Sequence, residues 1–342
     1  MSRPRSALEA QLLRALESRE SRKIRRRLPD PIAKLHSFQN HNHSRDPSNA
    51  EPSLNPALLI DFNSNDYLSF STLPKLRERF LCKLHAAPSI LGSGGSRLLV
   101  NGKAHSDLEE RLKVFFNPRS GPNDTALLFN SGFDANVGFF SCIPQPGDAI
   151  VYDEHIHASV HDGMRASRVK DEMRVPFAHN DVEDLREVLI RLTKTEGFAR
   201  GSRSVFVSVE SLYSMDGTLS PLLAIADLLD EIFPNGNAYL IVDEAHSTGI
   251  YGDKGRGRVC ELGLEDRVLA RLYTFGKALA ASGAVIITTE LVRDFLLNYA
   301  RSLIYTTSLS YANVLSADAS FDLLEDGTGE QVCVAYIVLC IL

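Results

Sequence analysis

Short apolar runs alternate with amphipathic stretches from about residue 105 onward. Apolar runs of about four to eight residues, bounded by small or polar residues, are typical of buried strands. We therefore predict strands at 126–130, 149–152, 205–209, 239–243, 271–275 and 284–288. Apolar residues at helical spacing between these runs predict helices, among them Asp181–Leu192 and Leu222–Ile232.

This alternation predicts an α/β fold, in which a mostly parallel sheet is sandwiched by helices. Sheets of this kind bind ligands beyond the carboxyl ends of their strands. Several of the predicted strands run into polar residues at that end, namely Asn130, Ser131, Asp153, Asp243 and Lys277. We therefore expect the functional site along this edge, within a large domain that spans residues 61–310.

The first 60 residues differ from the rest, and we predict a separate N-terminal helical segment and loop at 1–60. Leucines recur there at helical spacing, at Leu8, Leu12, Leu13 and Leu16. The basic run Arg25–Arg27 is interpreted as a solvated helix end, with anion or carboxylate binding as the alternative. Residues 40–56 are polar and proline-containing and predict a loop. The histidines in this region have no Cys or carboxylate partner and are expected to be solvated rather than metal-bound, namely His36, His41 and His43.

Composition excludes two classes of protein. The 342 residues carry a net charge of −6, whereas a nucleic-acid coat needs a cationic face. No uncharged apolar run approaches the roughly 18 residues of a membrane span, and the N-terminus lacks the apolar run of a secretory signal. The five cysteines are widely spaced and form no C-x-x-C pair: Cys82, Cys142, Cys260, Cys333 and Cys340. We expect reduced thiols and a cytoplasmic location, with a peroxisomal one as the alternative.

The segment Val242–His246 (V-D-E-A-H) ends a predicted strand. Helicases use D-E-A-H beside a magnesium-bound nucleotide, but they also need a G-x-x-x-x-G-K-[ST] loop upstream. No such loop occurs in this sequence, so we reject a nucleoside triphosphatase. Asp243 is instead interpreted as an acid at a strand end.

The segment Thr274–Lys277 (T-F-G-K) lies at the end of another predicted strand. Small residues follow it and predict that Lys277 is semi-buried. Burial lowers the pKa of a lysine, and a neutral amine can form a Schiff base with an aldehyde. Position alone leaves an ordinary surface lysine as the alternative.

A third motif, Asn130–Asn136, runs from a strand through Ser131 and Gly132 into a helix. Free backbone N–H groups at such a helix start can bind a phosphate, although small turns of this kind are common. The fourth motif, Asp153–Ser159 (D-E-H-I-H-A-S), is rich in histidine. The spacing of these histidines matches neither H-E-x-x-H nor a zinc finger, so we predict no metal site for the set His155, His157 and His161.

The four motifs together fit pyridoxal 5′-phosphate. This cofactor needs a lysine for its aldehyde, a carboxylate for its ring nitrogen and an anion site for its phosphate. An aromatic group often stacks on the ring of the cofactor. A histidine of the fourth motif is a candidate for this role.

The same motifs resemble the α-oxoamine synthases, a branch of the fold-type I pyridoxal-phosphate enzymes, and most closely the biotin-pathway members of that branch. The resemblance runs from about residue 8 to about residue 315 and keeps the family's motif order. The matching stretches are NSNDYLSF (63–70), GSGGSRLLVNGKAHSDLEERL (92–112), LLFNSGFDANVGFF (127–140), AHND (178–181), SLYSMDGTLSPL (211–222), VDEAHSTGIYGDKGRG (242–257), TFGKALAASGAVI (274–286) and ARSLIYTTSLS (300–310).

The resemblance implies a role for each matching residue. Lys277 resembles the lysine that binds the cofactor's aldehyde and later removes the α-proton of the amino acid. Asp243 resembles the partner of the ring nitrogen. His246 resembles the histidine on the phenolic oxygen, and His157 the one stacked on the ring.

Four further residues resemble cofactor contacts. Ser214 and Thr274 match positions that bind the cofactor, Thr274 at the phosphate. Gly132 and Phe133 match the phosphate-binding turn.

The implied reaction is a decarboxylative condensation of an amino acid with an acyl-CoA thioester, giving an α-oxoamine. For the biotin branch the substrates are L-alanine and a pimeloyl thioester. Asn65 and Arg25 resemble substrate-binding residues, and the family implies a homodimer without nucleic-acid or membrane partners. The alternatives are another α-oxoamine synthase, an aminotransferase-like enzyme, and an inactive homologue that acts as a partner subunit.

The sequence departs from the family after Ser310. We expect residues 311–342, which end in VCVAYIVLCIL, to be the remnant or mispredicted start of a C-terminal domain. In the family that domain carries an arginine that binds the substrate carboxylate, and this sequence has no counterpart of it. The expected loss of a bidentate contact puts the activity of this polypeptide, but not its family, in question.

Overall fold

The computed structural model describes residues 6–28, 64–117 and 124–332, and the chain divides into two compact units, 1–63 and 64–342. The first unit contains helix α1 (Ala7–Ser21), which starts with a capping box between Ser6 and Glu9 and buries none of its residues. A helix therefore occurs where the leucine spacing predicts one. The loop at 40–56, its histidines and residues 333–342 lie outside the described residues.

The second unit is built on one seven-stranded sheet with the order β1-β7-β6-β5-β4-β2-β3. Pairing is antiparallel between β7 and its two neighbours and parallel elsewhere. All strands except β7 therefore run in one direction, and their carboxyl ends share one edge. The strands are β1 (Asp124–Phe129), β2 (Ala149–Asp153), β3 (Arg174–Phe177), β4 (Val205–Glu210), β5 (Ala238–Asp243), β6 (Val268–Thr274) and β7 (Ala284–Thr289).

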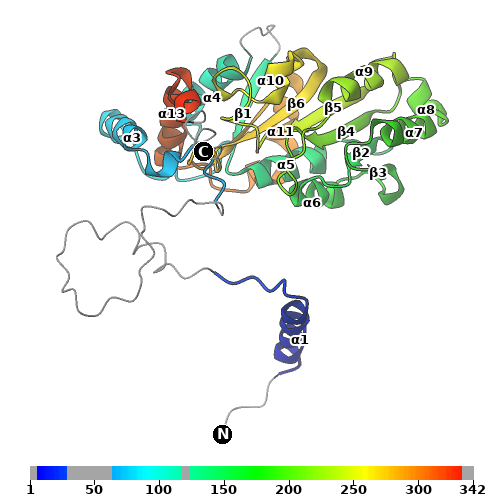
Figure 1. Cartoon of the computed structure of the whole chain (residues 1–342), viewed down its shortest axis with the longest axis horizontal. Coiled ribbons are helices and arrows are strands. Elements are labelled where there is room, and N and C mark those ends of the chain that lie inside the picture. The colour runs from blue at the N-terminus through cyan, green and yellow to red at the C-terminus, as the bar shows by residue number, and fades with distance from the viewer. Residues whose placement is uncertain (1–5, 29–63, 118–123, 333–342) are drawn as a thin grey trace, which may run out of the picture. The chain divides into compact units, whose positions relative to one another are not determined.

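Helices cover both faces of this sheet (Figure 1). Successive strand residues point to opposite faces, and in β1 Leu128 enters one apolar cluster whereas Leu127 and Phe129 enter another. One face packs against α5, α6, α11 and α12, and the other against α4 and α13 at one end and α7 and α9 at the other. These helices are α4 (Lys103–Phe116), α5 (Gly132–Cys142), α6 (Ala158–Ala166), α7 (Val182–Thr193), α9 (Leu222–Ile232), α11 (Glu290–Tyr299), α12 (Arg301–Ile304) and α13 (Tyr311–Glu325).

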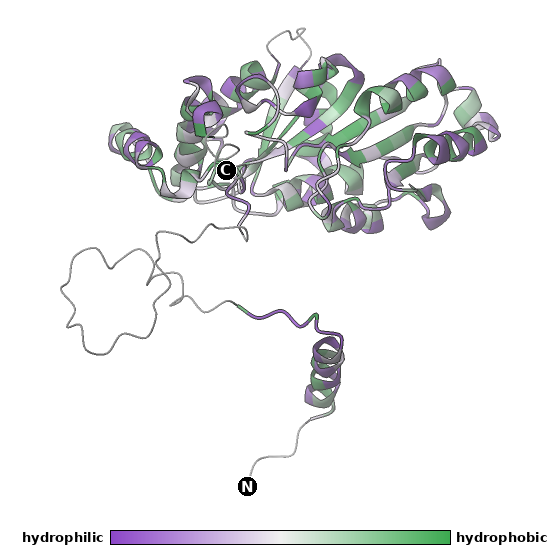
Figure 2. Ribbon diagram, viewed as in Figure 1, coloured by the Kyte–Doolittle hydropathy of each residue, from purple (hydrophilic) through white to green (hydrophobic). Residues whose placement is uncertain are grey.

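The described part of the unit also contains the helices α3 (Pro74–Ala86), α8 (Glu196–Ala199) and α10 (Arg258–Leu262). The strands are predominantly apolar along their length, as expected of a sheet buried on both faces (Figure 2). Among the described residues, no helix has the length and apolar character needed to cross a bilayer.

The predicted α/β class and mostly parallel sheet are confirmed, with strand ends within a few residues of the prediction. Strand β3 was not predicted, because its four residues include Arg174 and Pro176 and lie at the sheet edge. Proline is tolerated there since an edge strand leaves some N–H groups unpaired. The antiparallel direction of β7 has no local signal in the sequence either.

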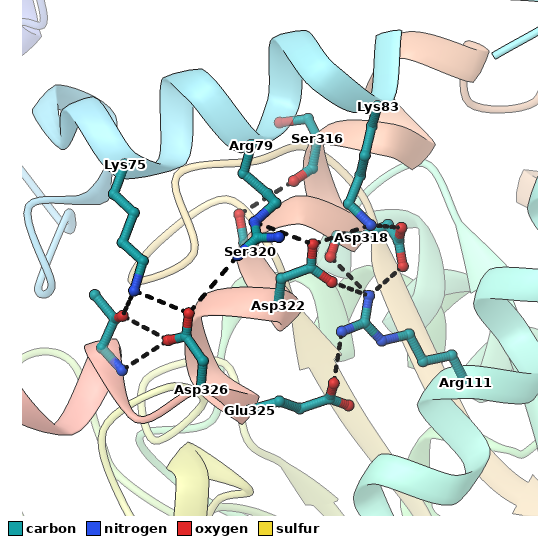
Figure 3. A network of polar contacts seen from close by, with 11 residues as sticks. Lys75, Arg79, Lys83, Arg111, Ser316, Asp318, Ser320, Asp322, Glu325 and Asp326 are labelled. Carbon is teal, nitrogen blue, oxygen red and sulfur yellow. Dashed lines mark hydrogen bonds and ion pairs between the residues drawn. The ribbon is translucent and has the colours of Figure 1, made fainter. Parts of the chain in front are cut away.

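Helix α13 is anchored to α3 and α4 by a network of ion pairs (Figure 3). Arg111 of α4 lies at its centre, with Nη1 2.9 Å from Asp322 Oδ1 and Nη2 2.8 Å from Glu325 Oε2, and it also pairs with Asp318. Lys83 of α3 contacts the same two aspartates. Beneath this polar layer the inner face of α13 is buried, so residues 311–325 belong to the core of the unit.

Replacement of Arg111 by alanine is expected to lower the free energy of unfolding by about 2 kcal/mol. The side chain is 21% exposed, so its loss falls between the small effect of a surface pair and the larger effect of a buried one. Lys103→Ala is the matched control, because Lys103 forms an exposed pair with Asp107 and should cost less than about 0.5 kcal/mol. Urea unfolding measures both, and equal losses would contradict the anchoring role of the network.

Candidate active site

The carboxyl edge of the sheet gathers the polar residues that the sequence places after separate strands. Gly132 follows β1, Asp243 ends β5, and Lys277 lies just beyond β6. His157 lies beyond β2 on the same edge. Because these strands share one direction, residues far apart in the sequence lie along one edge of the sheet.

Lys277 is half-buried, as predicted. Its Nζ lies 2.9 Å from Nε2 of His246. Burial lowers the pKa of Lys277, while the carboxylates of Asp243 and Glu210 act in the opposite direction. The amine is thus easier to deprotonate than a surface lysine, and this property is what a nucleophilic or basic lysine requires.

A chain of hydrogen bonds extends from Lys277 through His246 to Tyr67 and Asn65. Nδ1 of His246 lies 2.7 Å from the Tyr67 hydroxyl, and that hydroxyl donates to Oδ1 of Asn65 at 3.0 Å. Burial and the nearby Lys277 lower the pKa of His246 to about 4. The imidazole is therefore neutral near pH 7, so Nε2 can accept a hydrogen bond from Lys277 while Nδ1 donates to Tyr67.

Asp243 is linked to His157 by buried polar groups. The Asn136 amide donates to Oδ2 of Asp243 at 2.8 Å and to Oγ of Ser159 at 3.0 Å. Oγ of Ser159 in turn lies 2.7 Å from Nδ1 of His157. The backbone N–H of Ala245 donates to Oδ1 of Asp243 at 2.9 Å. These contacts fix the orientation of both the carboxylate and the imidazole.

Within the D-E-A-H segment, Asp243 and His246 lie at the site, whereas Glu244 is part of the core. Glu244 is fully buried and accepts hydrogen bonds from Ser211, from Ser247, and from the N–H groups of Arg258 and Val259. It secures the following turn, where a Cβ on Gly257 would lie 2.8 Å from the Glu244 carboxylate. Asp243 and His246 of the same motif form the contacts at the site described above.

The turn after β1 has the form of an anion site. Ser131 is the N-cap of α5, and its side chain accepts from the N–H of Asp134. A Cβ on Gly132 would lie 3.4 Å from the side chain of Thr274, so glycine keeps space open beside that hydroxyl. Phe133 is 46% exposed on the first turn of the helix. The start of an eleven-residue helix next to a threonine hydroxyl suits a phosphate group.

Sequence reasoning missed Glu210 at the end of β4. It pairs in register with Asp243 and is 5% exposed. Burial raises the pKa of Glu210 to about 8; the Asp243 carboxylate acts in the same direction, and Lys277 opposes it. An acidic residue ending a buried strand is the same signal that identifies Asp243, so the sequence did contain a pointer to it.

Glu210→Gln is expected to change how stability depends on pH. The folded-state pKa of Glu210 is above its ordinary value, so its stabilising contribution is complete below about pH 4.5 and is lost as the pH rises through about 8. Between pH 5 and 8 the unmodified chain should lose on the order of 4 kcal/mol more than the variant. Urea unfolding at several pH values measures this, with the exposed Glu187→Gln as control. Parallel profiles for Glu210→Gln and the unmodified chain would contradict it.

The residues on this edge fit pyridoxal phosphate. Lys277 can bind an aldehyde, and Asp243 can pair with a protonated ring nitrogen. The turn at Gly132, together with the nearby hydroxyl of Thr274, can bind a phosphate. The N-terminus of α5, close to the Thr274 side chain, is the structural feature that favours a bound anion there.

Comparison with known proteins agrees with this fit. A family model described as aminotransferase class I and II matches residues 58–330. The chain belongs to this family. The resemblance to α-oxoamine synthases is also confirmed, since the chain is 50% identical over 281 residues to an 8-amino-7-oxononanoate synthase of Emericella nidulans. That match covers 81% of this chain and 66% of the relative.

Two other relatives are similar over comparable lengths. The chain is 43% identical over 275 residues to the aminoacyl transferase sphA of Aspergillus fumigatus, covering 80% of this chain and 57% of that protein. The fold matches a serine palmitoyltransferase variant from S. paucimobilis with a bound PLP–myriocin aldimine, with a TM-score of 0.65 and 28% identity. That match covers 76% of this chain and 61% of the other. The chain therefore spans about two thirds or less of the length of these relatives.

Two site residues predicted from the family resemblance, Ser214 and Asn65, form no hydrogen bond or ion pair with Lys277 or Asp243 among the described contacts. Ser214 is exposed in the turn after β4, and Asn65 reaches the site only through Tyr67. Arg25 lies in the N-terminal unit, where Nη1 is 3.4 Å from Glu20 Oε2. Their roles remain predictions. Tyr67, Asn136 and Ser159 were not predicted, because hydrogen bonds between distant segments leave no local pattern.

Proposed function

We propose that this chain catalyses a pyridoxal-phosphate-dependent decarboxylative condensation of L-alanine with a pimeloyl thioester, as in biotin biosynthesis. The observation that carries the proposal is the half-buried Lys277, which contacts a neutral His246 on the edge that also carries Asp243. The 50% identity to an 8-amino-7-oxononanoate synthase supports the choice of substrates.

The proposed roles follow from the position of each side chain. The cofactor, when bound, supplies an electron sink for a carbanion. Nζ of Lys277 binds the cofactor's aldehyde and, once released, takes the α-proton of the amino acid. Asp243 holds a proton on the ring nitrogen, and Asn136 and the N–H of Ala245 keep its carboxylate in place. His157 would hold the ring of the cofactor by stacking on it.

The remaining proposed contacts complete the site. Gly132, Phe133 and Thr274 are proposed to bind the phosphate, His246 the phenolic oxygen, and Ser214 the cofactor at a position that its motif does not specify. Asn65 and Arg25 are proposed substrate contacts, and the working form is proposed to be a homodimer. These assignments are supported by the resemblance of their motifs to those of the family.

A second candidate is the condensation of another amino acid or acyl group. The 43% identity to the aminoacyl transferase sphA favours this alternative. Both candidates use the same cofactor and the same lysine, so they differ only in the pockets for the amino-acid side chain and the acyl chain.

The test is an assay of the full 342-residue chain with pyridoxal phosphate and each pairing of L-alanine, glycine or L-serine with pimeloyl-CoA or palmitoyl-CoA. Thiol release measures CoA, and mass spectrometry identifies the product. We expect kcat/KM for alanine with pimeloyl-CoA to exceed the other pairings by about tenfold or more. A preference for serine or palmitoyl-CoA would favour the second candidate. Binding of the cofactor without condensation of any pair would overturn both.

A further inference from the structure

Three side chains outside the proposed cofactor site converge beyond three neighbouring strands. His155 follows β2, His179 follows β3, and Asp216 follows β4. Their ligand atoms all lie within 4.8 Å of one another. Among the residues that the structure describes, this is the group of histidines and carboxylates with the geometry to hold a metal ion.

A buried carboxylate orients the central histidine. Asp153 is 1% exposed, and its oxygens accept the N–H groups of His155 and Asn180, each at 2.9 Å. Oδ1 of Asp153 also lies 2.8 Å from Nδ1 of His179. A carboxylate that accepts two backbone N–H groups acts as an acceptor toward the imidazole as well, so Nδ1 of His179 carries the hydrogen. In the neutral ring, Nε2 of His179 then presents its lone pair.

This lone pair faces another acceptor. Nε2 of His179 lies 3.3 Å from Oδ2 of Asp216. Two lone-pair atoms at this distance repel each other unless a proton or a cation lies between them. Two ligands of a tetrahedral zinc ion, each at about 2.0–2.1 Å from the metal, are separated by roughly 3.4 Å. The observed distance therefore suits a shared zinc ion.

His155 completes the set. Its ring stacks on that of His179 with centroids 4.1 Å apart, and its Nδ1 lies 3.9 Å from Oδ2 of Asp216. Its side chain is 46% exposed, so it has room to turn out of the stack and direct Nδ1 at an ion that enters from solvent.

We propose that His155, His179 and Asp216 bind a Zn²⁺ ion, with water as the fourth ligand. Two imidazoles and a carboxylate are donors that zinc accepts, and a histidine whose second nitrogen donates to a carboxylate is the usual support for such a ligand. The ion replaces two contacts of Nε2 of His179, one at 2.8 Å to the Thr218 hydroxyl and one at 3.1 Å to the Asn180 amide.

The ion would join the ends of three strands. Asp216 lies in the turn that also carries Ser214, so zinc would fix this turn against β2 and β3. The site uses none of the residues assigned to cofactor binding, so it does not depend on the proposed function. The spacing of His155, His157 and His161 predicts no metal for that set, and the present site shares only His155 with it.

The test is a zinc titration of the full chain, expressed without a polyhistidine tag and dialysed against EDTA. All samples carry His36→Ala, His41→Ala and His43→Ala, so that these three histidines cannot bind the ion. Calorimetry with zinc chloride should show one ion per chain. His155→Ala and Asp216→Asn should each weaken binding by about tenfold or more, whereas the exposed His85→Ala on α3 should not.

Cobalt provides a second readout that a folding defect would not imitate. Co²⁺ in a tetrahedral site should give intense visible absorption bands in the parent chain and weak bands in the two ligand variants, while His85→Ala keeps them. Absence of stoichiometric zinc binding, which would mean a proton rather than an ion on His179, would overturn the proposal. So would equal affinity in parent and variants. The zinc titration is run with and without pyridoxal phosphate. Zinc binding that does not depend on the cofactor supports the metal site even where the proposed condensation fails.

Discussion

Lys277→Ala is expected to abolish covalent attachment of pyridoxal phosphate and to reduce condensation by roughly 10³–10⁴-fold. The variant loses both the amine for the aldehyde and the base for the α-proton, and a positioned base alone contributes about 10²–10⁴-fold. The measurements are the visible spectrum with added cofactor and the rate of CoA release.

Lys170→Ala is the matched control, because the Lys170 side chain is 76% exposed and pairs only with Glu172 among the described ion pairs. It should bind the cofactor and react like the unmodified chain. Retention of the lysine-dependent absorption band in Lys277→Ala would place the reactive amine elsewhere and contradict the account of the site.

Asp243→Asn is expected to lower kcat by on the order of 10²–10³-fold, the usual effect of removing one preorganised electrostatic group. The amide cannot hold a proton on the ring nitrogen, so the ring accepts electrons poorly. The Asn136 amide would also face an amide in place of a carboxylate. Cofactor attachment through Lys277 should survive, and this separates the electronic role of Asp243 from a role in binding.

The same variant should shift the pH profile. The Asp243 carboxylate raises the pKa of Lys277, so its removal lowers that pKa further. The limb of the kcat/KM profile that reports Lys277 should therefore move to lower pH. Asp107→Asn, an exposed change on α4, is the control. An unchanged kcat in Asp243→Asn would refute its role at the ring nitrogen.

The sequence predicted a sheet between layers of helices, but not the order and direction of its strands. Buried strands such as Val205–Glu210 are continuous apolar runs, and this local signal is strong. The edge strand Arg174–Phe177 lacks it, and the antiparallel β7 is set by packing against β1 and β6. Strand order depends on contacts between distant segments, which periodicity does not encode.

Prediction of the site also depended on whether a residue leaves a local signal in the sequence. Lys277 and Asp243 are predicted as site residues because each lies at the end of an apolar run, where parallel sheets bind their ligands. Tyr67 was missed because its link to His246 spans 179 residues of sequence. The cluster of His155, His179 and Asp216 was missed for the same reason, since three separate strands bring its members together.

The most direct test of the account is borohydride reduction of the full chain with added pyridoxal phosphate, followed by peptide mass spectrometry. The account predicts one reduced pyridoxyl group per chain, on the peptide that contains Lys277. Label spread over exposed lysines such as Lys103 and Lys170, or an unlabelled Lys277 peptide, would contradict the claim that this edge of the sheet is a cofactor site.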